Sequence, residues 1–367
     1  LPAGTYQVRL TANEAKPDAR GSSEVLERWV EFTQKGEVKG REVVSIVPND
    51  EIKLVQKDAP KAGFKLTRID DEFGTLDFGG MVVTPFPRGG WNLERRLRDM
   101  DAHGYDVQVL SICPFTFCYW LEPELTLAVS QIQNEQMAAL AKRMPDRFMS
   151  IATLPMQSPK LAADEMRRAM TKLGMRGIQI GSMVNGRNLD DPALEPVWST
   201  AEELGAFILI HPMNAVGVPG VESYYLKNLI GNPLDSTVAA AALIFGGVLE
   251  RHPRLNICMV HGGGFAPYQI GRWVHGWEVR PEPKVTIKGS PQDSFDKLYF
   301  DTILHASPPL EFLVDLVGST RVLLGTDYPF DMGQYDLGIV NAISVSDGDK
   351  ANILRNNAVK LVGAAGR

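Results

Sequence analysis

Three apolar runs in the second half of the chain end in residues that could bind a metal or move a proton. These residues are His211, His261 and Asp327. Each run has the length of a buried strand and stops at Gly or Pro, so we expect a parallel strand with its polar residue at the carboxyl end. In a barrel of alternating strands and helices, that end holds the active site. The chain has six histidines, and two at equivalent strand ends favour an enzyme.

The rest of this half alternates between strand-like and helix-like stretches. The three runs above cover residues 206–212, 256–264 and 321–330, and further strands are predicted at 106–112, 149–155, 177–182 and 297–302. Apolar residues three and four apart predict helices at 92–101, 125–143, 160–173 and 194–204. Such alternation implies a parallel sheet. Seven strands fit an α/β fold of the distorted (β/α)₈ TIM barrel type whose remaining strand lies upstream.

The first ninety residues follow a different pattern. Residues 64–80 alternate in period two around a turn-prone centre, which predicts a small inserted β-hairpin outside the barrel. Residues 42–48 are the compact apolar run that could supply the first barrel strand, and residues 22–34 predict an amphipathic helix. We therefore expect an N-terminal extension over residues 1–42 and a barrel over 43–367, with an insertion at about 50–90.

Composition limits the class of protein. The 367 residues are 44% hydrophobic and 22% charged, as in globular proteins. A net charge of −6 argues against nucleic acid or an acidic membrane as partner, and the apolar stretches are strand-sized. Cys113, Cys118 and Cys258 form no metal or redox spacing, and Cys258 is most simply a buried hydrophobe. These observations predict a reduced, cytoplasmic protein.

Several of these segments together resemble a known family. The segments are His211-Pro212, 261–272, 325–330, 95–101, 153–157 and 177–181. They are similar to the aminocarboxymuconate-semialdehyde decarboxylase family (amidohydrolase-related family 2) of the amidohydrolase superfamily. The resemblance implies a distorted (β/α)₈ barrel with a small inserted hairpin, usually dimeric. It also implies a metal-dependent decarboxylase of aromatic or muconate-like acids, with a few hydrolases and hydratases among the relatives.

The resemblance assigns roles to individual residues. His211 and Asp327 resemble metal ligands, for zinc or manganese, and His261 resembles the histidine that acts as acid and base. Arg272 resembles the arginine that reaches a substrate carboxylate from the neighbouring subunit, and Arg88 lies near a second such arginine. Neutral imidazole and carboxylate suit these metals, and arginine grips a carboxylate with two parallel hydrogen bonds.

Two further residues are candidates from their positions. Trp120 closes an aromatic group at residues 115–120 that follows the second predicted strand, so it could line a pocket for a flat substrate. Core or dimer packing is the alternative for this group. His305 comes just after the seventh predicted strand and could face the site.

The chain departs from the family at the first strand. The family carries a His-x-His pair there, whereas Val43 and Ser45 stand at the matching spacing. Either the chain has lost half of the metal site, or Leu1-Pro2 follows a His-x-His pair that has been removed.

The resemblance implies that the function is that of a decarboxylase-like carbon–carbon lyase. His261 and Asp327 would do the acid–base chemistry on an aromatic or unsaturated carboxylic acid, with a divalent metal. The first alternative is a hydrolase or a hydratase or cyclase that works without a full metal site. The second is a non-catalytic relative that binds a small acid. The expected partners are the small carboxylic acid and a second copy of the chain.

Overall fold

The computed structural model describes residues 6–15, 23–32, 38–39, 50–55, 64–78, 81–213 and 217–365. The chain divides into two compact units, one formed by residues 1–106 with 327–333 and the other by 107–326 with 334–367. The predicted first barrel strand at 42–48, with Val43 and Ser45, lies outside the described residues. The predicted division of the chain after residue 42 stays a prediction.

The first unit contains a four-stranded antiparallel sheet. Its strands, in the order β3-β2-β1-β4, are β1 (Tyr6–Ala15), β2 (Ser23–Phe32), β3 (Val38–Lys39) and β4 (Asp50–Val55). The helix predicted for residues 22–34 is therefore wrong, because β2 pairs with β1 along ten residues. Val25, Trp29 and Val30 suit a strand as well as a helix, and pairing with the preceding strand β1 decided between the two.

The same unit contains the predicted hairpin. Strands β5 (Phe64–Arg68) and β6 (Phe73–Phe78) pair in antiparallel fashion, and β7 (Met81–Pro87) extends them to three strands. Asp70 Oδ1 shapes the turn by accepting hydrogen bonds from the backbone N–H groups of Glu72 and Phe73, each at 2.8 Å. Helix α1 (Leu93–His103) follows, capped by the Asn92 side chain.

The second unit contains the seven strands predicted for the barrel. They are β8 (Gln108–Leu110), β9 (Phe148–Ser150), β10 (Gly177–Gly181), β11 (Phe207–His211), β12 (Asn256–Met259), β13 (Tyr299–Asp301) and β14 (Val322–Leu323). β8 pairs with β9, a parallel bridge joins Ala152 to Ile178, and β10 to β14 pair in chain order. All of these pairings are parallel, so the seven strands follow one another as in the wall of a (β/α)₈ barrel.

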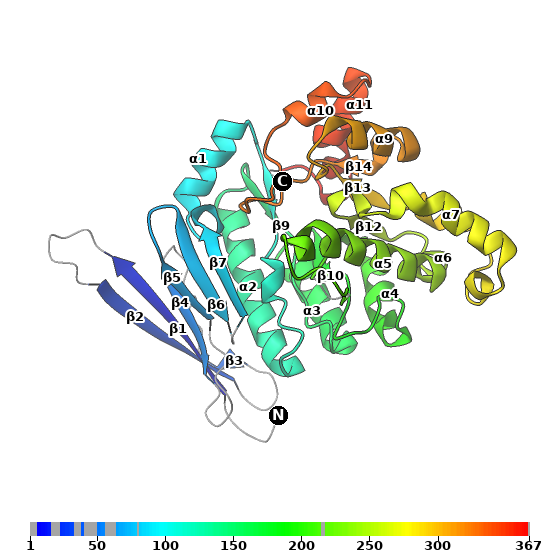
Figure 1. Ribbon diagram of the computed structural model, residues 1–367. Helices are drawn as coiled ribbons and strands as arrows, with labels where there is room; N and C mark the ends of the chain where they lie inside the picture. Colours follow the sequence, from blue (N-terminus) through cyan, green and yellow to red (C-terminus); the bar gives the residue numbers. More distant parts are fainter. Residues whose placement is uncertain are drawn as a thin grey trace. The chain divides into compact units, whose positions relative to one another are not determined.

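Helices connect these strands (Figure 1). They are α2 (Pro123–Arg143), α3 (Pro159–Lys172), α4 (Glu195–Leu204), α5 (Asn232–Phe245), α6 (Val248–Arg251), α7 (Ala266–Val279), α8 (Pro291–Phe295) and α9 (Ser307–Val317), followed by α10 (Gly338–Ala342), α11 (Asp347–Ala351) and α12 (Asn357–Val362). The helices predicted at 92–101, 125–143, 160–173 and 194–204 are confirmed as α1 to α4. No helix of the described residues is long and apolar enough to cross a membrane.

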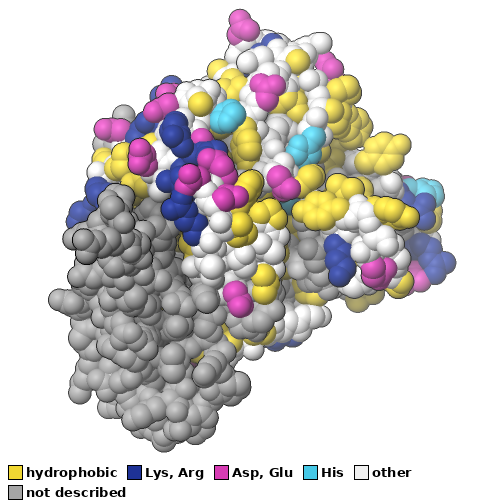
Figure 2. Space-filling view, turned by 60° about the vertical axis from the view of Figure 1, so that its left-hand side comes forward, with side chains coloured by type: hydrophobic (Ala, Val, Ile, Leu, Met, Phe, Trp, Pro, Cys, Tyr) yellow, Lys and Arg dark blue, Asp and Glu magenta, His cyan; other side chains and the backbone are white. Residues whose placement is uncertain are grey.

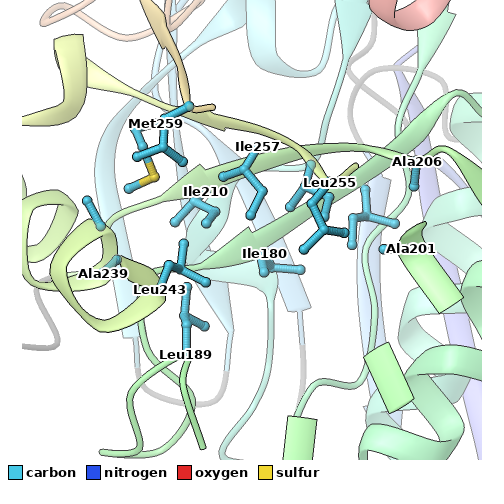
Figure 3. Close-up of a cluster of buried hydrophobic side chains, with 14 of the residues drawn as sticks. Ile180, Leu189, Ala201, Ala206, Ile210, Ala239, Leu243, Leu255, Ile257 and Met259 are labelled. Carbon is cyan, nitrogen blue, oxygen red and sulfur yellow. The ribbon is translucent and has the colours of Figure 1, made fainter. Parts of the chain in front are cut away.

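Side chains along each strand point alternately to opposite faces, and this alternation decides which buried cluster each of them joins. Ile257 and Met259 of β12 belong to a large buried cluster, whereas Cys258 between them joins a smaller one, as expected for a buried hydrophobe. In the large cluster, Ile210 of β11 and Ile257 lie close to Leu243 of α5 (Figure 3). Burying each such side chain stabilises the fold by about 1.5–3 kcal/mol, so the core holds the strand ends in place.

Candidate active site

His211 is the last residue of β11, and its surroundings fix its ring. Its backbone pairs with Gly181 of β10, and its carbonyl accepts a hydrogen bond from Ser182 N–H at 3.0 Å. Its Nδ1 lies 2.8 Å from the Pro212 carbonyl oxygen. Since a carbonyl only accepts, Nδ1 carries a proton, and in the neutral ring Nε2 then keeps its lone pair. This is the tautomer that a metal-binding histidine needs.

His261 begins a turn of four consecutive residues in the left-handed region. Their φ angles are 56° at His261, 58° at Gly262, 78° at Gly263 and 64° at Gly264. A Cβ atom would come within 2.5 Å of Leu304 at Gly262, 2.6 Å of Phe300 at Gly263 and 2.0 Å of the Pro233 oxygen at Gly264. The three glycines therefore allow a close approach of neighbouring atoms to the backbone, and His261 is the turn's one residue with a side chain.

Asp301, the last residue of β13, was not predicted from the sequence. It is 4% exposed, and its Oδ1 accepts hydrogen bonds from the N–H groups of Gly262 at 2.9 Å and Ile303 at 3.1 Å. Burial raises the pKa of the Asp301 carboxyl, while the charge of His261 and the N–H bonds work in the opposite direction. A polar residue ending a predicted strand beside His261 was the signal that could have found it.

Asp235, in the first turn of α5, was also missed. It is 1% exposed, and its Oδ2 lies 3.1 Å from both Ser182 Oγ and Met213 N. The carboxylate therefore joins the end of β10 to the loop that leaves His211. Nothing in the local sequence distinguishes this aspartate from a surface one.

The structure brings the three predicted strand-end residues together. The rings of His211 and His261 lie 5.4 Å apart between centroids. Asp327 lies in the loop shortly after the end of β14, and its backbone φ is 51°. One ligand atom from each of the three lies within 4.8 Å of the others. The imidazole of His211 and the carboxylate of Asp327 are donors that fit zinc or manganese.

Trp120, His305 and Arg272 also belong to the second unit. Phe117 and Tyr119 stack in the core at 5.3 Å, whereas Trp120 is 45% exposed. The exposed His305 lies in a loop held by Gln334 Oε1, which accepts the His305 N–H at 2.8 Å. Arg272 is exposed on α7. The roles predicted for these residues stay predictions.

Arg88 belongs to the first unit and supports the hairpin. Its Nη1 donates to the Asp71 carbonyl at 2.9 Å, and its backbone N–H donates to the Glu72 carbonyl at 2.7 Å. The Arg88 side chain thus stabilises the hairpin turn. Its binding of a substrate carboxylate stays a prediction.

Comparisons with known proteins agree with this geometry. The family model described as amidohydrolase matches residues 66–364. A 2-amino-3-carboxymuconate-6-semialdehyde decarboxylase from Dictyostelium discoideum is 39% identical over 276 residues, which cover 74% of this chain and 77% of that protein. The crystal structure of a 2,6-dihydroxybenzoate decarboxylase from Rhizobium is 27% identical, with a TM-score of 0.67 over 74% of this chain and 88% of that chain.

One further solved structure carries a metal. It is a dihydroxybenzoic acid decarboxylase from Polaromonas sp. JS666 with bound manganese and the inhibitor 2-nitroresorcinol. It is 26% identical, with a TM-score of 0.67, and the match covers 75% of this chain and 87% of that chain.

Proposed function

The chain belongs to the amidohydrolase family, and on that premise we propose that it releases CO₂ from a small aromatic or unsaturated carboxylic acid. The observation that carries this proposal is the convergence of His211, His261 and Asp327, whose ligand atoms lie within 4.8 Å of one another. Relatives that share most of the chain are named decarboxylases of such acids.

A divalent metal, zinc or manganese, fits the proposed site. His211 Nε2 and the Asp327 carboxylate would hold it. When bound, such an ion stabilises negative charge that develops on a substrate oxygen. The hydrogen bond from His211 Nδ1 to the Pro212 carbonyl at 2.8 Å keeps Nε2 available for it.

His261 supplies the proton chemistry in this proposal. The bond between the substrate carbon and its carboxylate carbon breaks, and the electron pair stays on the substrate carbon. His261, in its protonated form, donates a proton to that carbon, and CO₂ leaves. The imidazole then takes a proton from solvent and returns to its starting state. Histidine suits this role because its ordinary pKa lies near neutral pH.

We also propose a homodimer in which Arg272 reaches the carboxylate of the substrate bound by the partner. Tyr268, one turn before Arg272 on α7, is 78% exposed and lies 6.1 Å from the Phe312 ring of α9. Phe265, directly before α7, and Leu316 of α9 are also apolar and are 41% and 37% exposed. Exposed hydrophobic side chains gather in patches on the surface (Figure 2), and such patches typically mark interfaces.

The free state of the three cysteines supports a reducing, cytoplasmic location, which we include in the proposal.

The direct test measures CO₂ release by the purified protein loaded with manganese or zinc. The candidate acids are 2,6-dihydroxybenzoate and 2-amino-3-carboxymuconate-6-semialdehyde. We expect turnover, and we expect His261→Gln to lower kcat by about 10²–10⁴-fold. His103→Gln, at the exposed carboxyl end of α1, is the matched control and should keep full activity. Water addition to an acid without CO₂ release would instead support the hydrolase or hydratase alternative.

A further inference from the structure

We propose that Asp301 is a positioning residue, which holds the left-handed turn that begins at His261 and so sets the direction of the catalytic imidazole. The kinetic part of this proposal rests on the proposed function. The structural part does not, because it concerns contacts between the ends of β12, β13 and β14 within the second unit.

The first support is the pair of hydrogen bonds at Asp301 Oδ1. One comes from Gly262 N–H, the residue next to His261, at 2.9 Å, and the other from Ile303 N–H at 3.1 Å. A single oxygen therefore joins the His261 turn to the loop that leaves β13. Because the carboxylate is 4% exposed, water does not compete for these bonds.

The second support is the backbone that these bonds hold. His261 has a φ of 56°, a conformation that residues with a Cβ atom rarely adopt. Such a conformation persists only where the surroundings impose it, and it recurs at functional sites. The bond to Gly262 acts on the peptide unit that follows His261, so it acts directly on the residue whose direction matters.

The third support comes from the neighbouring strand end. A Cβ atom on Gly325 would lie 2.8 Å from Asp301 Cβ and 2.9 Å from its Oδ2. Thr302 Oγ1 lies 3.2 Å from Gly325 N and 3.4 Å from Gly325 O. The end of β14 is thus packed against this carboxylate, and the three atoms nearest to a methyl group at Gly325 would all belong to Asp301.

Asp301 differs from Glu165, a buried carboxylate that forms an ordinary ion pair, in the partners of its side chain. Glu165 on α3 is 2% exposed, and its carboxylate is paired with Arg168 Nε at 2.7 Å and Asn134 Nδ2 at 2.7 Å. Within the described residues, Asp301 forms no ion pair with Lys or Arg, and its partners are backbone N–H groups and the charge of His261. Its surroundings are therefore those of a carboxylate that joins two loops through their backbone N–H groups.

The experiment compares Asp301→Ala, Asp301→Asn and Gly325→Ala with Glu165→Gln as the control, all in the full chain loaded with metal. Steady-state kinetics gives kcat and KM. Side-chain ¹⁵N spectra of labelled histidine, assigned with His261→Gln, report on the His261 ring without substrate.

For Asp301→Ala we expect kcat to fall about 10²-fold while KM changes little, because a small displacement of a reacting group has this effect. Asp301→Asn keeps an Oδ1 acceptor, so it should recover part of this loss. Gly325→Ala should resemble Asp301→Ala. All three should shift the His261 ring signals and leave those of His275 unchanged. Glu165→Gln should lower thermal stability and leave kcat and the His261 signals unchanged.

Unchanged His261 signals and kcat in folded Asp301→Ala would overturn the proposal. If Asp301→Ala does not fold, unchanged His261 signals in both Asp301→Asn and Gly325→Ala would overturn it equally. A wild-type protein that releases no CO₂ would refute the proposed function alone, and the spectra would still decide the role of Asp301.

Discussion

The rings of His211 and His261 meet edge to face, with centroids 5.4 Å apart and an interplanar angle of 77°. The two residues follow neighbouring strands, since Ile210 of β11 pairs with Met259 of β12. Their backbones differ, because His211 ends a regular strand whereas His261 begins a left-handed turn. This difference suits a fixed ligand at His211 and a proton carrier at His261.

The first prediction separates these two roles by metal content. His211→Ala removes the nitrogen donor that we assign to the metal, so we expect the affinity for manganese or zinc to fall at least 10–100-fold. His261→Gln should keep the metal and lose activity. Elemental analysis after dialysis against metal-free buffer measures both, with His275→Ala as the control. Full metal occupancy in His211→Ala would remove this residue from the site.

The second prediction concerns the glycine that closes the His261 turn. Gly264 has a φ of 64°, and a Cβ atom there would lie 2.0 Å from the Pro233 carbonyl oxygen. We expect Gly264→Ala to lower the free energy of unfolding by roughly 3 kcal/mol or more, since backbone strain and a backbone clash add together.

The control for that prediction is Gly276 in the interior of α7, where a Cβ atom would meet nothing within 4 Å. Gly276→Ala should leave the free energy of unfolding unchanged or raise it by up to about 1 kcal/mol. Urea denaturation of the two variants beside the wild type gives the comparison. Equal stability of both variants would contradict the geometry of the turn.

The triplet of strand-end residues could be predicted from sequence because each signal is local. An apolar run and the polar residue that ends it lie within a few positions of each other. Asp301 also ends a predicted strand, so the same signal could have found it. Asp235 could not be recognised in this way, since its partner Ser182 lies 53 residues away along the chain. The error at β2 has the same cause, because its pairing with β1 overrode a local pattern that also suited a helix.

The third prediction concerns which of the three cysteine thiols react with a labelling reagent. Burial raises the pKa of the Cys118 thiol to about 12, and burial also raises that of Cys258 well above its usual range. At about pH 8 a thiol reagent should therefore label Cys113, which is partly exposed, and spare the other two until the protein is unfolded. Mass spectrometry of labelled peptides measures this, and rapid native labelling of Cys118 would contradict its burial.

The raised pKa also has a consequence for stability. A neutral Cys118 thiol is favoured in the folded state, so its contribution is fully present below the ordinary thiol pKa of 9.0. The contribution declines as the pH rises from that value toward about 12, where the folded protein must also ionise the group. We expect Cys118→Ser to reduce this alkaline loss of stability and to leave the pH dependence between about 6 and 8 unchanged.

The last prediction tests whether Arg272 acts across a dimer interface. Arg272→Gln alone should lower kcat/KM by about 10–100-fold, because it removes charge-assisted hydrogen bonds to the substrate carboxylate. His261→Gln alone should be nearly inactive.

If Arg272 serves the partner's site, a mixed dimer of the two variants contains one site with both residues intact. Random mixing of equal amounts would then restore about a quarter of the wild-type activity. If Arg272 serves its own chain, no site in any mixture has both residues, and activity stays at the level of the separate variants. The mixture is made by unfolding and refolding the two variants together, and refolding each variant alone provides the control.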